Sequence, residues 1–323
     1  MKYQFEFYKE SDAEEVEQLI IKGYEWEYPI FGLSRYEFAK ELHPCFTELK
    51  RVWERTEGVF REKGRIIACA INEGTEESDV FFLFDSKERA TEIELLEEMI
   101  YFAKTTMSSV EANQTTRYVN LRIPKWNQAL REVAQKLGFI QTSWDEKIYI
   151  HSFEDEKREA LLPEGYTLVD GETTPDFYLA NIHMAAFNYD IGARKRSEEA
   201  FRHLRTMKYY NKKLDLCILD PMKRPVAMAV IWYDERMPYC ELDPLGVVWW
   251  ERRKHLGTAL LNEAELRIKK LYPNCKGMLG GNQIFYEKIG YEKKAEVPIY
   301  RWEIEIYPSW DKKSQDRYYH KEI

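Results

Sequence analysis

The sequence is poor in the patterns that mark metal sites and disulfide frameworks. It has five cysteines in 323 residues, an odd number, and no two of them have CxxC spacing. Its six histidines form no HExxH pattern. Neither a disulfide framework nor a zinc site is indicated, and we expect no bound metal.

Long apolar runs and an excess of basic charge are also missing. No run of about 18 apolar residues occurs, and the N-terminal residues lack the apolar segment of a signal peptide. We therefore expect a cytoplasmic protein with no membrane partner. The 48 Lys and Arg are outnumbered by 56 Asp and Glu, for a net charge of −8. A general nucleic-acid binder needs a basic face, so we expect no nucleic-acid partner.

What the chain does contain is apolar and aromatic material. Hydrophobic residues make up 44% and aromatic residues 15%, with 22 Tyr and 9 Trp. Aromatic side chains build cores and line pockets for ligands with flat or apolar parts. The length is sufficient for two domains of ordinary size, each with its own core.

The order of expected elements repeats once along the chain. Each half consists of a strand, two helices, a meander of strands, a helix, a strand, a helix and a last strand. Near the end of each half, an Asn is followed by Leu137-Gly138-Phe139 or by Ile289-Gly290-Tyr291. This order predicts a mixed α/β (α+β) fold with a central sheet in each half. We expect domains at 1–152 and 164–307, a linker at 153–163 and a tail at 308–323.

The stretch from Asp243 to Asn262, DPLGVVWWERRKHLGTALLN, has the features of an anion site. A strand-like run is followed by a basic turn, and an apolar-periodic helix begins near Gly257. The first N–H groups of a helix have no internal partner and can bind a phosphate. Gly257 allows close approach of the backbone, and the basic residues add charge. The alternative is an ordinary solvated basic turn before a helix.

Three segments of the second half together resemble the GNAT superfamily of acyl-CoA-dependent N-acetyltransferases. Residues 252–257, RRKHLG, are similar to the family's pyrophosphate loop, with His255 where the first Gly is usual. Residues 280–291, GGNQIFYEKIGY, are similar to its Asn-x-x-x-Tyr region, and residues 297–300 to its last strand. The resemblance implies two tandem GNAT-like domains, each with a mixed, mostly antiparallel sheet flanked by helices.

The resemblance also implies residue roles around acetyl-CoA, the expected co-substrate. The strand end would present backbone N–H groups to the pantetheine and thioester, the basic loop would hold the pyrophosphate, and Asn282 would bond the pantetheine arm. The expected binding residues are Leu245, Gly246, Val247, Arg252, Arg253, Lys254, His255, Gly257, Thr258 and Asn282. Tyr286 would be the general acid that protonates the thiolate.

For the general base, the sequence offers two carboxylates. Glu241 and Asp243 are two apart on the strand that leads into the loop, so they face the same side of the sheet. Either carboxylate is able to accept the amine proton, directly or through water, and to attract a cationic acceptor. Either one is equally well explained as a solvated edge residue or as an ion-pair partner.

The first half departs from the family pattern where phosphate would bind. At the equivalent position it has Asp85-Ser86-Lys87-Glu88-Arg89, which contains no Gly and two acidic residues. Acidic groups repel a diphosphate, so we expect this half to bind no CoA and to cover a sheet edge or shape the acceptor pocket.

The resulting hypothesis is an acetyl-CoA-dependent N-acetyltransferase that acts on a primary amine of a small molecule, as a monomer or homodimer. Two alternatives remain at this point. One is a protein that binds acyl-CoA without turnover and regulates a partner. The other is a structural or interaction protein that no longer binds CoA.

Overall fold

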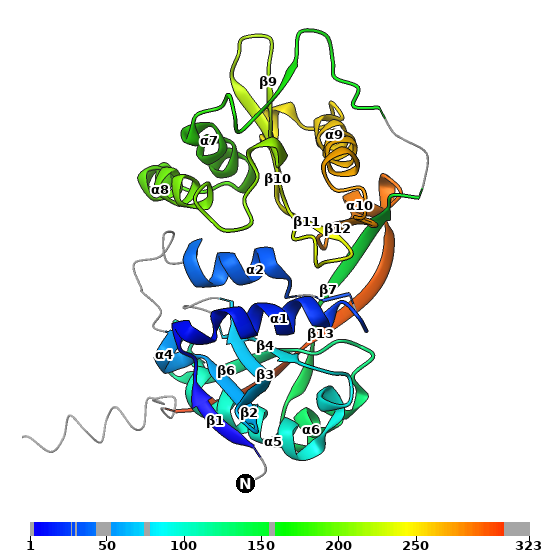
Figure 1. Ribbon diagram of the computed structural model, residues 1–323. Helices are drawn as coiled ribbons and strands as arrows, with labels where there is room; N and C mark the ends of the chain where they lie inside the picture. The colour runs from blue at the N-terminus through cyan, green and yellow to red at the C-terminus, as the bar shows by residue number, and fades with distance from the viewer. Residues whose placement is uncertain are drawn as a thin grey trace, which may run out of the picture.

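The computed structural model describes residues 3–26, 28–29, 31–42, 53–73, 78–154 and 159–306. Part of the predicted linker and the whole of the predicted tail lie outside these residues. Within them the fold is a mixed α/β fold, as predicted, with helices on both sides of a long sheet (Figure 1). No helix in the described ranges is both long and apolar enough to cross a lipid bilayer. No cluster of His, Cys, Asp and Glu in these ranges is arranged to hold a metal ion.

The described residues of the first half form seven strands and the helices that flank them. Its strands are β1 (Gln4–Phe7), β2 (Gly58–Glu62), β3 (Arg65–Asn72), β4 (Asp79–Phe84), β5 (Ser109–Val110), β6 (Thr116–Arg122) and β7 (Ile140–Ser152). Its helical segments are η1 (Glu10–Asp12), α1 (Ala13–Gly23), α2 (Leu33–Glu37), η2 (Phe38–Leu42), α4 (Trp53–Thr56), η3 (Arg89–Thr91), α5 (Ile93–Phe102), η4 (Ala103–Met107) and α6 (Gln128–Lys136).

The second half repeats this order. Its strands are β8 (Thr167–Asp170), β9 (Asp215–Leu219), β10 (Pro225–Trp232), β11 (Cys240–Val247), β12 (Gly277–Gly280) and β13 (Glu292–Glu305). Its helical segments are α7 (Asp176–Phe187), η5 (Ile191–Ala193), α8 (Arg194–Leu204), η6 (Lys212–Leu214), η7 (Trp249–Glu251), α9 (Leu256–Leu271) and α10 (Ile284–Lys288). Gly138 and Gly290, which follow α6 and α10, have nearly the same positive φ of 91° and 90°. The predicted repeat therefore holds at the level of single backbone positions.

The two halves exchange their last strands. The sheet order is β1-β2-β3-β4-β6-β13-β7-β12-β11-β10-β9-β8, with β5 beside β6. Strand β13, from the end of the second half, pairs with β6 of the first. Strand β7, from the end of the first half, pairs with β12 of the second. The sequence predicts a central sheet in each half, whereas the described strands form one continuous 13-stranded sheet (Figure 1).

The halves also share a hydrophobic core. Val16, Leu19 and Leu33, from α1 and α2, belong to the same buried cluster as Ile218 and Met228 of the second half. A separate cluster in the first half packs α5 and α6 against the other face of its strands. Helices α1 and α2 thus lie between the halves (Figure 1).

Candidate active site

Strand β11 separates from its neighbour β12 part-way along its length. The two strands are parallel and pair at Cys240 with Met278 and at Glu241 with Leu279. Beyond Glu241, no further residue of β11 pairs with β12 in the described chain. On its other edge β11 pairs with β10, with a bulge between Leu242 and Leu245. The separation leaves one edge of β11 open for a ligand.

A cleft of about 790 Å³ follows the open end of β11. We call it the loop cleft; the predicted binding residues among its lining are Leu245, Gly246, Val247, Arg252, Arg253, His255, Gly257 and Thr258. Helix α9 begins here, with the N–H groups of its first turn at the cleft. A Cβ atom on Gly257 would lie 3.3 Å from the Phe285 ring, so the glycine keeps this cleft open.

The basic turn contains two residues in the left-handed region. Arg253 has φ 67° and His255 has φ 59°. His255 is the residue immediately before α9 and stands where the family pattern has Gly, which adopts this conformation without a steric penalty. The His255 backbone therefore adopts the conformation that glycine adopts easily. For a residue with a Cβ atom, that conformation costs about 1–2 kcal/mol of free energy.

The basic side chains of the turn point in different directions. Arg252 donates to the carbonyl oxygens of Val247 (3.3 Å) and Ala186 (2.7 Å), and so ties the end of β11 to α7. Lys254 pairs with Glu251 at 2.8 Å and does not line the loop cleft, contrary to the predicted pyrophosphate role. Arg253 and Lys288 do line it. Lys288 was not predicted from sequence as a binding residue.

A second cleft, also of about 790 Å³, lies between the two halves. We call it the interdomain cleft; its lining includes Ser34, Arg35, Phe38, Glu73, Arg122 and Glu146 from the first half and His183, Glu241, Asp243, Pro244 and Asn282 from the second. Phe187 lines both clefts. Residues 243–244 of β11 face the interdomain cleft and residues 245–247 face the loop cleft, so the two clefts meet along one strand.

The two candidate bases have different surroundings. Glu241 is buried, and its carboxylate accepts hydrogen bonds from the Tyr24 hydroxyl and from the Ser34 backbone N–H (2.8 Å) in the first turn of α2. Asp243 lines the interdomain cleft and has no hydrogen-bond partner for its carboxylate within the described ranges. Asp243 is exposed at the cleft, but the protein packed around its carboxyl group desolvates it and raises its pKa to about 6, although the Arg35 guanidinium lowers the pKa. Of the two carboxylates, Asp243 is the one that is open to the interdomain cleft and has no hydrogen-bond donor among the described residues.

Comparisons with known proteins bear on this geometry. A scan against protein-family models finds no match, and a search of curated proteins finds none either. Among solved structures, a GCN5-related N-acetyltransferase from Sphaerobacter thermophilus is similar at 12% identity and a TM-score of 0.60, over 94% of this chain and 96% of that chain. A tandem GNAT protein from the clavulanic acid biosynthesis pathway is similar at 11% identity and a TM-score of 0.61, over 93% and 98%.

The chain has a tandem GNAT fold. The fold expected from the sequence is therefore confirmed, across both halves. At this level of identity the likeness concerns the fold, and the roles of individual residues are argued from their positions.

Tyr286 lies behind the floor of the interdomain cleft in this tandem GNAT fold. It is 6% exposed, and its ring packs against Gly280, where a Cβ atom would lie 2.6 Å from the ring. Gly280 and Gly281 line the cleft, and Tyr286 itself lines neither cleft. Burial raises its pKa to about 12, so the phenol is protonated at neutral pH, as a proton donor must be.

Asn282 has different partners from those the sequence suggests. Its side-chain oxygen accepts from the Lys147 backbone N–H at 3.0 Å, and its amide nitrogen donates to the Asp145 carbonyl at 3.2 Å. Both partners belong to the exchanged strand β7. Asn282 lines the interdomain cleft instead of the loop cleft, so a bond to a pantetheine arm is not part of the function proposed below.

In the equivalent region of the first half, the side chains pair with one another. Strands β4 and β6 also separate after two pairs. Here Asn127 donates to the Ala90 carbonyl at 2.8 Å, which joins α6 to η3. Arg89 pairs with Glu62 and Glu92, and the Lys87 ammonium lies 5.7 Å from the centre of the Trp126 ring. At the corresponding place in the second half, α9 and α10 line the loop cleft.

Proposed function

We propose that this protein transfers an acetyl group from acetyl-CoA to the primary amine of a small molecule, by direct attack in a ternary complex. The observation that carries the proposal is the separation of β11 from β12 beside the first turn of α9. That geometry brings an open strand edge, an anion-binding helix end and an interdomain cleft together. The similar solved structures named as N-acetyltransferases support the same reaction class.

The loop cleft fits the phosphate end of acetyl-CoA. The free N–H groups at the start of α9 and the side chains of Arg253 and Lys288 would bind the pyrophosphate. Glu251 also lines this cleft, and its negative charge is balanced by Lys254. The apolar lining, which includes Phe187, Phe285 and Ile289, suits the pantetheine arm. Bound acetyl-CoA supplies the activated thioester.

Two residues of this chain would accept and donate the protons of the reaction. A protonated amine entering the interdomain cleft would be attracted by Asp243 and would lose one proton to its carboxylate. The amine nitrogen then forms a bond to the acyl carbon as the carbon–sulfur bond breaks, and the second proton that the nitrogen loses passes to solvent. Tyr286 is the proposed donor of a proton to the leaving thiolate, from behind Gly280 and Gly281.

Two measurements on the full chain test the proposal. Isothermal titration with acetyl-CoA should give binding at micromolar to millimolar ligand, and release of free CoA thiol should depend on an added amine. Absence of acetyl-CoA binding would overturn the proposal. Binding without amine-dependent thiol release would favour a protein that binds acyl-CoA without turnover.

A further inference from the structure

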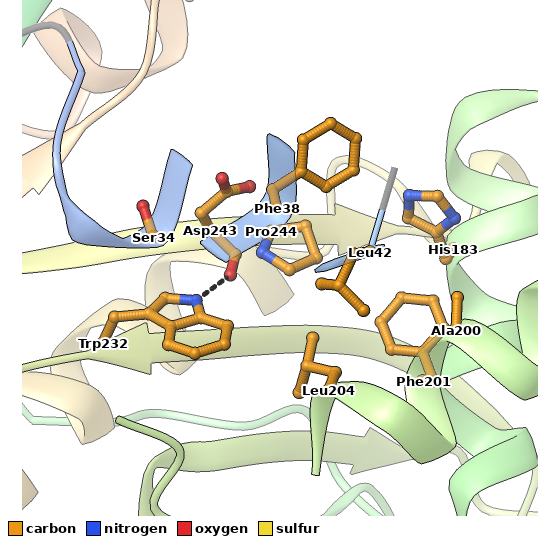
Figure 2. A pocket seen from close by; sticks show the side chains of 10 residues that line it. All are labelled: Ser34, Phe38, Leu42, His183, Ala200, Phe201, Leu204, Trp232, Asp243 and Pro244. Atoms are coloured by element: carbon orange, nitrogen blue, oxygen red, sulfur yellow. Dashed lines mark hydrogen bonds between the residues drawn. The ribbon is translucent and has the colours of Figure 1, made fainter. Parts of the chain in front are cut away.

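An apolar cavity opens off the interdomain cleft next to Asp243. It has a volume of about 60 Å³ and is lined by Ser34, Phe38, Leu42, His183, Ala200, Phe201, Leu204, Trp232, Asp243 and Pro244. Figure 2 shows the apolar side chains of both halves around this cavity, with the Asp243 carboxylate at one side of it. Five of the ten residues, including Asp243, also line the interdomain cleft, so the cavity is continuous with it.

The far wall of the cavity is apolar and buried. Phe201 is 3% exposed, and Leu204 and Trp232 are each 2% exposed. The Trp232 indole nitrogen donates to the Asp243 carbonyl at 2.6 Å, so its hydrogen-bonding group is already satisfied (Figure 2). This wall gives a ligand an apolar surface and no polar partner.

His183 brings no positive charge to the cavity. Its ring contacts Phe187, Tyr189 and Phe201, with centroid distances of 4.9 to 5.2 Å. Burial lowers the pKa of His183 to about 4, so the imidazole is neutral at physiological pH. Asp243 is therefore the charged residue among those that line the cavity.

The arginines near Asp243 already form ion pairs with carboxylates. Arg35 pairs with Glu73 (2.7 Å) and Glu146 (2.8 Å). Arg122 pairs with the same Glu146 (2.7 Å) and with Asp79 (2.8 Å). These contacts form a chain in which three carboxylates hold two guanidinium groups. An acceptor with its own carboxylate would have to displace one of them.

We propose that the acceptor is a primary amine on a short, uncharged apolar carbon chain, with its ammonium group at Asp243 and its chain in the cavity formed by Phe38, Leu42, Phe201, Leu204 and Trp232. This proposal rests on the proposed acetyl transfer and narrows its substrate class. A second ammonium group on the chain would lie against apolar side chains without a partner, and a carboxylate would meet the same wall. The transfer step is the one described above, with the amine proton going to Asp243.

Three compounds with the same four-carbon chain provide the test. The full-length protein is assayed with acetyl-CoA and n-butylamine, putrescine or γ-aminobutyrate, and thiol release is followed. We expect kcat/KM for n-butylamine to exceed the other two by about tenfold or more, because burying an unpaired polar group at the chain end is costly. Equal or better use of putrescine or γ-aminobutyrate would overturn the proposal.

Variants of the cavity wall give a second test. Leu204→Ala enlarges the cavity and should raise the kcat/KM ratio of n-hexylamine to n-butylamine about tenfold. Arg202→Ala, on the exposed side of the same helix, is the control and should leave that ratio unchanged. An unchanged ratio in Leu204→Ala would place the amine chain elsewhere.

Failure of this inference is distinguishable from failure of the proposed transfer. Acetylation of putrescine in preference to n-butylamine overturns the apolar acceptor and leaves the transfer intact. Should no amine be acetylated, titration of the three amines into the protein still decides: tighter binding of n-butylamine, weakened by Leu204→Asn, supports the cavity assignment. No preference among the three in that titration overturns it.

Discussion

Asp243 is exposed at the cleft, and both desolvation and nearby charges act on the pKa of its carboxyl group. Desolvation by the surrounding protein raises the pKa, the Arg35 guanidinium lowers it, and Glu73, Glu241 and Glu146 raise it again, with a result of about 6. A carboxylate with that pKa is ionised at neutral pH and still accepts a proton readily. Glu241, two residues earlier, is instead held by Tyr24 and by the start of α2.

The first prediction concerns pH. A general base must be deprotonated, so kcat/KM should fall as the pH decreases through about 6. Asp243→Asn should lower kcat by about 10²–10³-fold, and it should also remove the fall of kcat/KM at low pH. Glu235→Gln, a change to an exposed carboxylate in the loop between β10 and β11, should keep the wild-type profile. If kcat/KM of Asp243→Asn still fell at low pH, the general base would be another group.

Tyr286 leads to a second prediction at this scale. Tyr286→Phe keeps the ring that packs on Gly280 and removes only the hydroxyl. We expect kcat to fall by about 10²-fold while the dissociation constant of acetyl-CoA stays within about twofold. Parallel kinetic and titration measurements would check both. A variant with full activity would mean that the thiolate takes its proton from another donor.

The sequence identifies Glu241 and Asp243 as a pair and gives no means of separating them. Their alternation on a strand is local information, whereas their difference comes from partners far away in the chain. Tyr24 lies 217 residues before Glu241, and the Arg35 that lowers the Asp243 pKa belongs to the other half. The sequence of the second half by itself does not indicate which residues of the first half line the cleft.

Among the elements, α9 and the turn before it were predicted most closely. The sequence predicts a helix starting near Gly257, and α9 spans Leu256–Leu271. Apolar periodicity and a glycine in a basic turn are both local signals. For the two longest strands, β7 and β13, the sequence shows a strand pattern only over residues 146–150 and 297–306, so it indicates strands shorter than those observed. Their remaining residues pair across the boundary between halves.

The third prediction concerns the start of α9. Gly257→Glu would place a carboxylate side chain at the helix N-terminus, beside Phe285, where the pyrophosphate is proposed to bind. We expect acetyl-CoA affinity to fall by about 10²-fold or more, by clash and by charge repulsion. Thr91→Glu, exposed ahead of α5 in the first half, is the matched control and should bind normally. Retained affinity in Gly257→Glu would mean that the loop cleft does not bind the phosphates.

For the whole molecule, the repeat was readable from the sequence and the strand exchange was not. The repeat appears in the order of elements and in Leu137-Gly138-Phe139 and Ile289-Gly290-Tyr291. With strand exchange, β6 and β12 each pair with the last strand of the other half instead of the last strand of their own half. Both last strands offer similar backbone hydrogen bonds. The pattern along the chain therefore fits either arrangement equally well.

The fourth prediction follows from the exchange. Residues 1–154 produced alone would lack β13 and leave the edge of β6 open, and residues 159–323 alone would lack β7 beside β12. We expect each fragment to be insoluble or to show no cooperative thermal unfolding. Co-expression should restore a soluble complex, and the full chain should unfold in a single transition. A cooperative melt of either fragment alone would contradict the shared sheet as the unit of folding.

The exchanged strands also bear on how such a chain evolves. A duplicated gene ordinarily tolerates decay and deletion of one copy, because the other still folds. Here each copy completes the sheet of the other, so deletion of the first half would remove β7 from the half that carries the loop cleft. Selection can therefore relax on Asp85–Arg89, the first-half counterpart of the basic turn, while continuing to act on the strands around it.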